Sequence, residues 1–234
     1  MKTQLQTLSS ALLLTLGLGS CQALQSQFMP GESVTRVDDG LLSEVSAEEM
    51  NEIQTVRAAR DAAKDDLALA ERETRRAENR EDLAKSEKKI AKLQLEDAKL
   101  RVKFSEAEGT LSELRTDRKQ LEWADANMGT AELRFKLRGF QVDRAEAAES
   151  LAEELFALRV ADVELAKARA LRKLNRVSVQ VIEIEMFQLQ VEECSTRCDV
   201  AREKLASTTE TVDTMRSEYT QSRTMADDLR IASN

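Results

Sequence analysis

The stretch "IEMFQLQVEECSTRCDVAREKL", residues 184–205, carries a seven-residue apolar repeat that continues on both sides of it. One series of the repeat comprises Val177, Ile184, Val191, Cys198, Leu205, Val212, Tyr219 and Ala226, and the second lies three residues later, at Gln180, Phe187, Cys194, Ala201, Thr208, Met215, Ser222 and Leu229. These eight heptads of mostly apolar a and d positions predict a helix with a left-handed coiled-coil seam. The preceding "RVSVQVIEIE" alternates with period two in places, but the heptad passes through it, which favours a helix there too.

The composition also indicates long helices. Of 234 residues, 33% are charged and 3% aromatic, with one proline, seven glycines and no histidine. The net charge of −8 disfavours nucleic acid as a partner, because phosphates require a basic surface. The sequence lacks histidine and any recognisable nucleophile, glycine-rich or metal motif, and long paired helices form no enclosed pocket. We therefore expect no enzyme activity, no metal, no cofactor and no small-molecule substrate.

Local signals set the predicted helix bounds. Ser46 and Glu49 form a capping box, and no proline follows it. Asn127, Gly129 and Thr130 form the clearest later break, near the middle of the helical region. The prediction is an all-α fold, a long antiparallel helical hairpin with a first helix at 46–126, a turn at 127–130 and a second helix at 131–232. Open alternatives are a break after Gly109, where Thr110 and Glu113 form another capping box, a break at Gly139, and one continuous rod.

The first helix carries two apolar stripes. The upstream stripe, rich in small residues that favour close helix approach, comprises Ile53, Val56, Ala63, Leu67, Ala70 and Ala77. The downstream stripe has larger residues and is interrupted by Asp97 and Arg118; it comprises Ile90, Leu93, Leu100, Phe104, Leu111, Leu114 and Leu121. Both are predicted to face a partner helix, with a shift of register between them.

The N-terminus predicts an exported chain. Residues 1–20 contain Lys2 and an apolar core too short to span a bilayer, which is typical of a cleaved signal peptide. Leu18-Gly19-Ser20-Cys21 resembles the lipobox of bacterial lipoproteins. The resemblance implies cleavage before Cys21 and covalent lipid on it, and several acyl chains hold a protein firmly to a membrane. Residues 21–45, with Pro30, Gly31 and Gly40, are then predicted to be a flexible tether.

Cys194 and Cys198 occupy consecutive d and a positions of the heptad. Residues four apart on a helix have Cβ atoms about 5–6 Å apart, which exceeds the roughly 3.5–4.5 Å of a disulfide. Two alternatives remain: two buried thiols, or a disulfide between two parallel chains.

The charged, alanine-rich body, especially "LRVADVELAKARALRKLN", is similar to helical-hairpin lipoproteins of Gram-negative envelopes. The resemblance implies a lipid-anchored envelope protein. Gln22 follows the lipobox cysteine in place of Asp, which in enterobacteria-like lipoproteins implies the outer membrane, facing the periplasm. Its expected role is a coiled-coil spacer, scaffold or accessory subunit that binds an envelope partner or a second copy. The alternative is a holdase-like chaperone that shelters client chains between helical arms.

Overall fold

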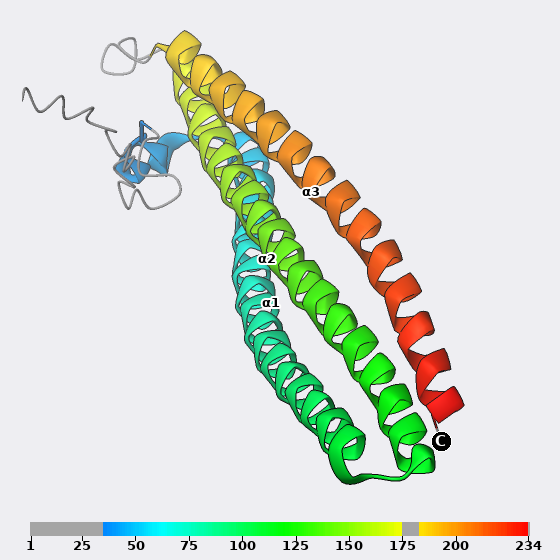
Figure 1. Ribbon diagram of the computed structural model, residues 1–234. Coiled ribbons are helices and arrows are strands. Elements are labelled where there is room, and N and C mark those ends of the chain that lie inside the picture. The colour runs from blue at the N-terminus through cyan, green and yellow to red at the C-terminus, as the bar shows by residue number, and fades with distance from the viewer. Residues whose placement is uncertain (1–34, 175–182, 234) are drawn as a thin grey trace, which may run out of the picture.

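A computed structural model describes residues 35–174 and 183–233, in which a short 3-10 helix, η1 (Asp39–Glu44), precedes three long α-helices. These are α1 (Ala47–Glu108), α2 (Leu111–Lys173) and α3 (Ile184–Ser233). Helix α2 runs antiparallel to both neighbours and lies between them (Figure 1). The all-α prediction is confirmed: α1 and α2 form a long helical hairpin, and α3 folds back along α2.

The predicted turn at 127–130, and with it the first helix at 46–126, is wrong, because α1 ends at Glu108 and α2 passes through Gly129 without a break. The chain turns at Gly109 and Thr110, the alternative break. There the Thr110 amide donates to the Glu113 carboxylate at 2.7 Å, and the Glu113 amide donates to the Thr110 hydroxyl at 3.3 Å. This capping box satisfies amides that only a helix start leaves unpaired.

The polar residues around Gly129 hold helices together instead of ending one. The Asn127 amide group donates to Gln94 of α1 at 3.2 Å. The buried Thr130 hydroxyl lies 2.9 Å from the Ser222 hydroxyl of α3. Gly129 itself is exposed, so its presence in the helix costs only about 1 kcal/mol relative to alanine.

The predicted second helix at 131–232 is also wrong, because α2 ends at Lys173 and α3 begins at Ile184 in the opposite direction. Val177 and Gln180 lie outside the described residues. The heptad is confirmed from Ile184 onward, since each of its a and d positions through Leu229 is buried or half-buried. This seam packs α3 against α2.

The upstream stripe of α1 is confirmed, because every residue from Ile53 to Ala77 named in it is buried or half-buried. The downstream prediction is wrong for Ile90, Leu93, Leu100, Phe104 and Leu111, which are exposed, while Leu114 and Leu121, which lie on α2, are half-buried. The register shift is also wrong. The buried face continues straight along α1 at seven-residue steps through Ala84, Ala91, Ala98 and Ser105. We call these four residues, with Ala77, the alanine seam; its small side chains let α1 lie close to α2.

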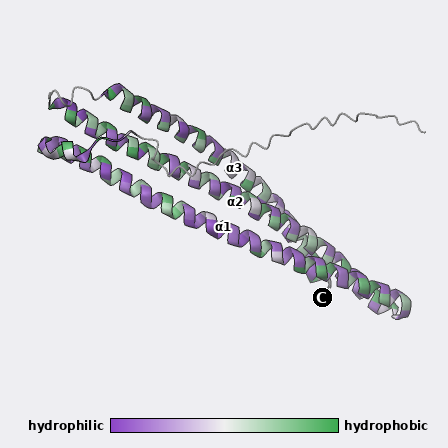
Figure 2. Cartoon of the chain, turned by 90° about the vertical axis from the view of Figure 1, so that its left-hand side faces the viewer, coloured by the Kyte–Doolittle hydropathy of each residue, from purple (hydrophilic) through white to green (hydrophobic). Residues whose placement is uncertain are grey.

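The open end of the hairpin holds the largest apolar cluster, which we call the base. It joins the N-terminal segment, α1, α2 and α3 through Val37, Leu42, Ile53, Leu165, Ala166, Ala168, Ala170, Leu171 and Phe187. The tether predicted for residues 21–45 is therefore wrong for residues 35–45, which pack on the bundle. Apolar and polar residues alternate along the helices (Figure 2), and within the described ranges none has a span long and apolar enough to cross a membrane.

We predict that Gly109→Ala destabilises the protein by more than 1 kcal/mol, because a Cβ at Gly109 would lie 2.8 Å from the Ser105 Cα and 2.9 Å from its carbonyl oxygen. Gly129→Ala is the matched control. A Cβ there meets nothing within 4 Å, so this change should stabilise the helix by about 0.5–1 kcal/mol. Urea unfolding measures both, and the opposite ranking would place the turn at Gly129.

Candidate functional site

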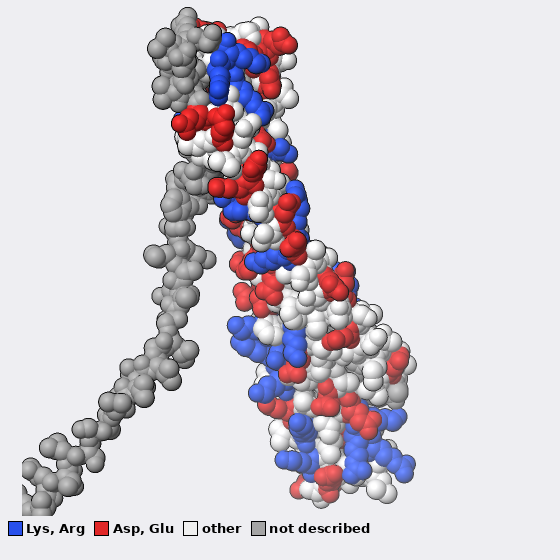
Figure 3. All heavy atoms as spheres, turned by 90° about the horizontal axis from the view of Figure 1, so that it is seen from above, with Lys and Arg blue, Asp and Glu red and all other residues white. Residues whose placement is uncertain are grey.

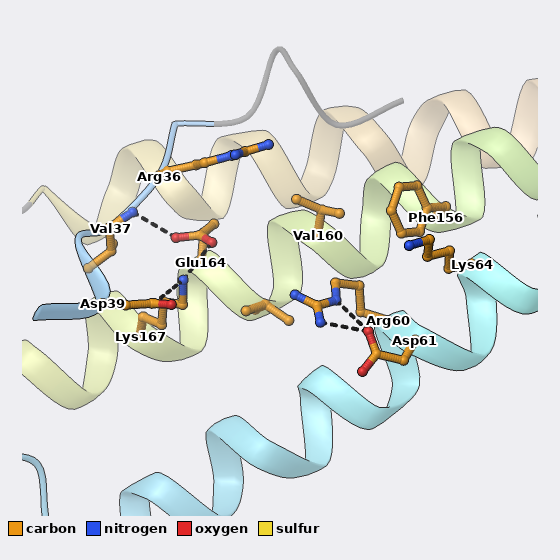
Figure 4. A pocket seen from close by; sticks show the side chains of 11 residues that line it. Arg36, Val37, Asp39, Arg60, Asp61, Lys64, Phe156, Val160, Glu164 and Lys167 are labelled. Carbon is orange, nitrogen blue, oxygen red and sulfur yellow. Dashed lines mark hydrogen bonds and ion pairs between the residues drawn. The ribbon is translucent and has the colours of Figure 1, made fainter. Parts of the chain in front are cut away.

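A buried ion pair fixes the N-terminal segment to α2 at the base. The Glu164 carboxylate accepts from the Val37 amide at 2.7 Å and from the Lys167 ammonium at 2.9 Å. Lys167 also lies 2.7 Å from Asp39, which Arg57 of α1 contacts at 3.1 Å. We call Val37, Asp39, Arg57, Glu164 and Lys167 the latch; Figure 4 draws all of them except Arg57. Glu164 and Lys167 are 5% and 6% exposed, so their charges require these partners.

The latch borders an open hollow of about 480 Å³ between the N-terminal segment, α1 and α2. The pKa of Asp39 is lowered, first by its hydrogen bond from Lys167 and further by the charges of Lys167 and Arg57. Arg60 pairs with Asp61 at 2.6 Å on the facing wall. Each acid of the lining, Asp39, Asp61 and Glu164, pairs with a basic side chain, and the lining also carries Arg36 and Lys64.

The sequence analysis missed Glu164 and Lys167. A signal for them does exist in "VELAKA", residues 163–168, where an acid and a base three residues apart interrupt apolar positions on several faces of the helix. All six residues are buried, because the N-terminal segment, α1 and α3 surround α2 here.

Of the predicted site residues, Cys21 lies outside the described residues, as does the predicted signal peptide at 1–20. Cys194 and Cys198 are 3% and 0% exposed and unpaired, and Cys194 packs against Ala157 and Ala161 of α2. Burial, the largest cause, raises the pKa of both thiols. The Arg197 guanidinium donates to the Cys194 sulfur at 3.1 Å and to Glu154 at 2.8 Å. Both thiols face α2, so a disulfide between chains would require α3 to separate from it.

Four residues predicted for the downstream stripe, together with Leu83, form an exposed surface of α1 on the side opposite the alanine seam. Leu83, Ile90, Leu93, Leu100 and Phe104 are each between 56% and 65% exposed. We call these five residues the outer apolar stripe. Their spacing is that of a and d positions, with Ser86 and Asp97 at two intervening core positions. The outer face of α1 therefore has the residue spacing of a coiled-coil seam, but no helix among the described residues packs against it.

Charge on the remaining surface is mixed. Basic and acidic side chains alternate over the face drawn in Figure 3, which shows no area of a single sign. Among the described residues, no three histidine, cysteine, aspartate or glutamate side chains are placed to hold a metal ion. No family model, no curated protein and no solved structure matches this chain.

We predict that Lys167→Ala releases residues 35–45 from the bundle, because it leaves Glu164 buried without its counter-charge. The loss of one partner from a buried pair costs about 3 kcal/mol, and release of the segment rehydrates the carboxylate. Hydrogen exchange should then show lost protection at Val37 and Leu42. Lys173→Ala is the control: its 64% exposed ammonium lies 3.3 Å from Glu49 and should contribute less than about 1 kcal/mol. Unchanged protection in Lys167→Ala would contradict the latch.

We predict that the unfolding free energy falls above about pH 9 more steeply in the native protein than in the Cys194→Ala/Cys198→Ala variant. The ordinary thiol pKa is 9.0, and burial raises it in the fold. Above pH 9 the unfolded chain therefore loses thiol protons that the native protein retains, which favours unfolding. Chemical denaturation between pH 7.5 and 10.5 measures this. Identical pH profiles would show that the thiols titrate normally.

Proposed function

We infer that this protein is a non-enzymatic lipoprotein of the bacterial cell envelope, anchored through Cys21 at the outer membrane and facing the periplasm. It acts as a scaffold, spacer or accessory subunit that binds a partner helix. The observation that carries this proposal is the outer apolar stripe: five large apolar side chains, exposed at a and d spacing on one helix face.

The physical argument rests on the free energy of exposed apolar surface. Burying one leucine, isoleucine or phenylalanine side chain contributes about 1.5–3 kcal/mol, and contiguous exposed apolar patches are characteristic of interaction surfaces. Three- and four-residue spacing places the side chains in a narrow stripe, which matches the seam of another helix. A globular partner surface without such a seam would leave part of the stripe in water.

The position of the base supports membrane attachment at that end. Thr35 is the first described residue, and its hydroxyl accepts from Gln190 of α3 at 2.9 Å. Thirteen residues separate it from Cys21, a stretch that spans at most ~50 Å. The base therefore stays close to a membrane that holds lipid on Cys21. The Gly109 turn lies about 90 Å away along α1, whose 62 residues rise 1.5 Å each.

We predict that a photo-reactive amino acid at Leu93 of the full-length chain gives one or a few discrete cross-linked products in cells. The same probe at Glu203, an exposed polar position on α3, is the control and should give none. Cys21→Ala should move both the chain and its products from the membrane fraction to the soluble fraction.

A broad range of products at Leu93 would contradict the scaffold and favour the chaperone that shelters clients. Absence of any product would contradict a partner at the stripe. Retention of Cys21→Ala in membranes after an alkaline wash would contradict the lipid anchor, because this change removes the acylated sulfur.

A further inference from the structure

We propose that the partner of the outer apolar stripe is a second copy of this chain, and that the two α1 helices pair antiparallel about a two-fold axis between Ala91 and Lys92. This inference rests on the proposed function, because it names the occupant of the same surface. The core positions and the charges beside them define a single pairing register for the two helices.

The four central apolar layers match in this register, and the outermost residue of the stripe, Phe104, faces Asn79. An antiparallel coiled coil packs each a position against a d position of the partner. Leu83 then faces Leu100 of the second copy, Ile90 faces Leu93, and the two-fold axis repeats both layers. The two polar core positions also meet, since Ser86 faces Asp97. A serine hydroxyl can donate to a carboxylate, so both interruptions of the apolar stripe are accommodated in the same layers.

The flanking charges match as well. The g positions on the open side of the seam are Asp82, Lys89, Glu96 and Lys103. All four side chains are exposed, and none makes an ion pair with another described residue. In the proposed register Lys89 faces Glu96 and Asp82 faces Lys103, and each pair occurs twice. The same stretch of helix therefore supplies four complementary pairs to a copy of itself.

The other pairings are worse. A shift of one heptad in one direction places Glu96 opposite Glu96 and Lys89 opposite Lys103. A shift in the other direction places Lys89 opposite Lys89 and Asp82 opposite Glu96. Parallel pairing buries Asp97 against Asp97 in the core. Like charges at such positions disfavour association, so the two shifted registers and the parallel pairing are less stable than the proposed register.

The remaining flank, on the side toward α2, adds no complementary charge pair in this register. Glu87 is already engaged by Arg134 of α2 at 2.7 Å, and Arg101 by Asp97 of its own helix at 2.8 Å. Arg80 would face Arg101 and Glu73 would face Glu108, so this flank adds like-charge contacts, which the ion pairs of Arg101 with Asp97 and of Glu73 with Arg76 reduce. Specificity therefore comes from the open side.

The antiparallel arrangement fixes the position of the two bases. About 45 residues of α1 separate its first turn from the two-fold axis, so the two bases lie about 130 Å apart at opposite ends. Tethers of at most ~50 Å then require the dimer to lie along the membrane that holds both anchors.

The first test is oxidative cross-linking in cells of two differently tagged full-length copies, one with Leu83→Cys and one with Leu100→Cys. These positions share a core layer, so a disulfide should form between the two tags. Leu83→Cys should not cross-link to itself, because residue 83 of each copy lies about 25 Å from its equivalent, 17 residues along the helix. Copies without an introduced cysteine give the background from Cys194 and Cys198, which are buried.

The second test exchanges charges in this cross-linking pair. Glu96→Lys or Lys89→Glu alone replaces two attractive pairs by two repulsive ones and should lower the yield of mixed dimer about tenfold. Lys89→Glu/Glu96→Lys restores opposite charges and should restore the yield. Lys99→Glu, an exposed lysine away from the seam, should leave it unchanged.

Self-linked Leu83→Cys would overturn the antiparallel register, and failure of the double exchange to restore the yield would overturn the charge pairing. The outcomes also separate this inference from the proposed function. If Leu93 cross-links only to a different envelope protein, the second copy is wrong and the scaffold remains. If it cross-links to nothing, both are wrong.

Discussion

The contact on which the rest of the fold depends is the packing of the alanine seam of α1 against α2. Small side chains at every seventh residue allow close approach of two helices, each more than 60 residues long. Each alanine buries little apolar surface, so the energy comes from repetition along the interface. The face of α1 that carries larger apolar residues is consequently turned away from its own bundle.

Helix α2 is the centre of the assembly because it has neighbours on two sides. Thr130 and Cys194 show how α3 is held, one through a hydroxyl pair with Ser222 and the other through apolar contact with Ala157 and Ala161. At the base the N-terminal segment adds a further neighbour, and α2 becomes buried at consecutive positions. The buried pair of Glu164 and Lys167 holds the N-terminal segment on α2, because either charge alone would be costly to bury.

Periodicity predicted the all-α fold and the α3 seam well, since one heptad register persists from Ile184 to Leu229. The sequence patterns gave wrong helix ends and a wrong packing face where one residue or helix could serve two roles. Thr130 has the chemistry of an N-cap and also that of a buried hydroxyl between helices, and only the partner Ser222, 92 residues later, distinguishes them. On α1 the larger residues gave the stronger apolar signal, whereas the alanines make the contact. The latch was missed because its members come from three segments of the chain, and the acid–base signal in "VELAKA" does not identify their partners.

A helix with apolar residues on two opposite faces is stable in water only as an inner member of an array. Helix α2 meets this condition with α1 on one side and α3 on the other. Helix α3 ends the array, because polar residues occupy every position between Val200 and Ile231 in the heptad register that its exposed Met186, Leu189, Val200 and Ile231 share. Helix α1 has two faces with heptad spacing and, among the described residues, a neighbour on only one of them. The outer apolar stripe of α1 is therefore the surface of this helical array that a further helix can cover to form a larger assembly.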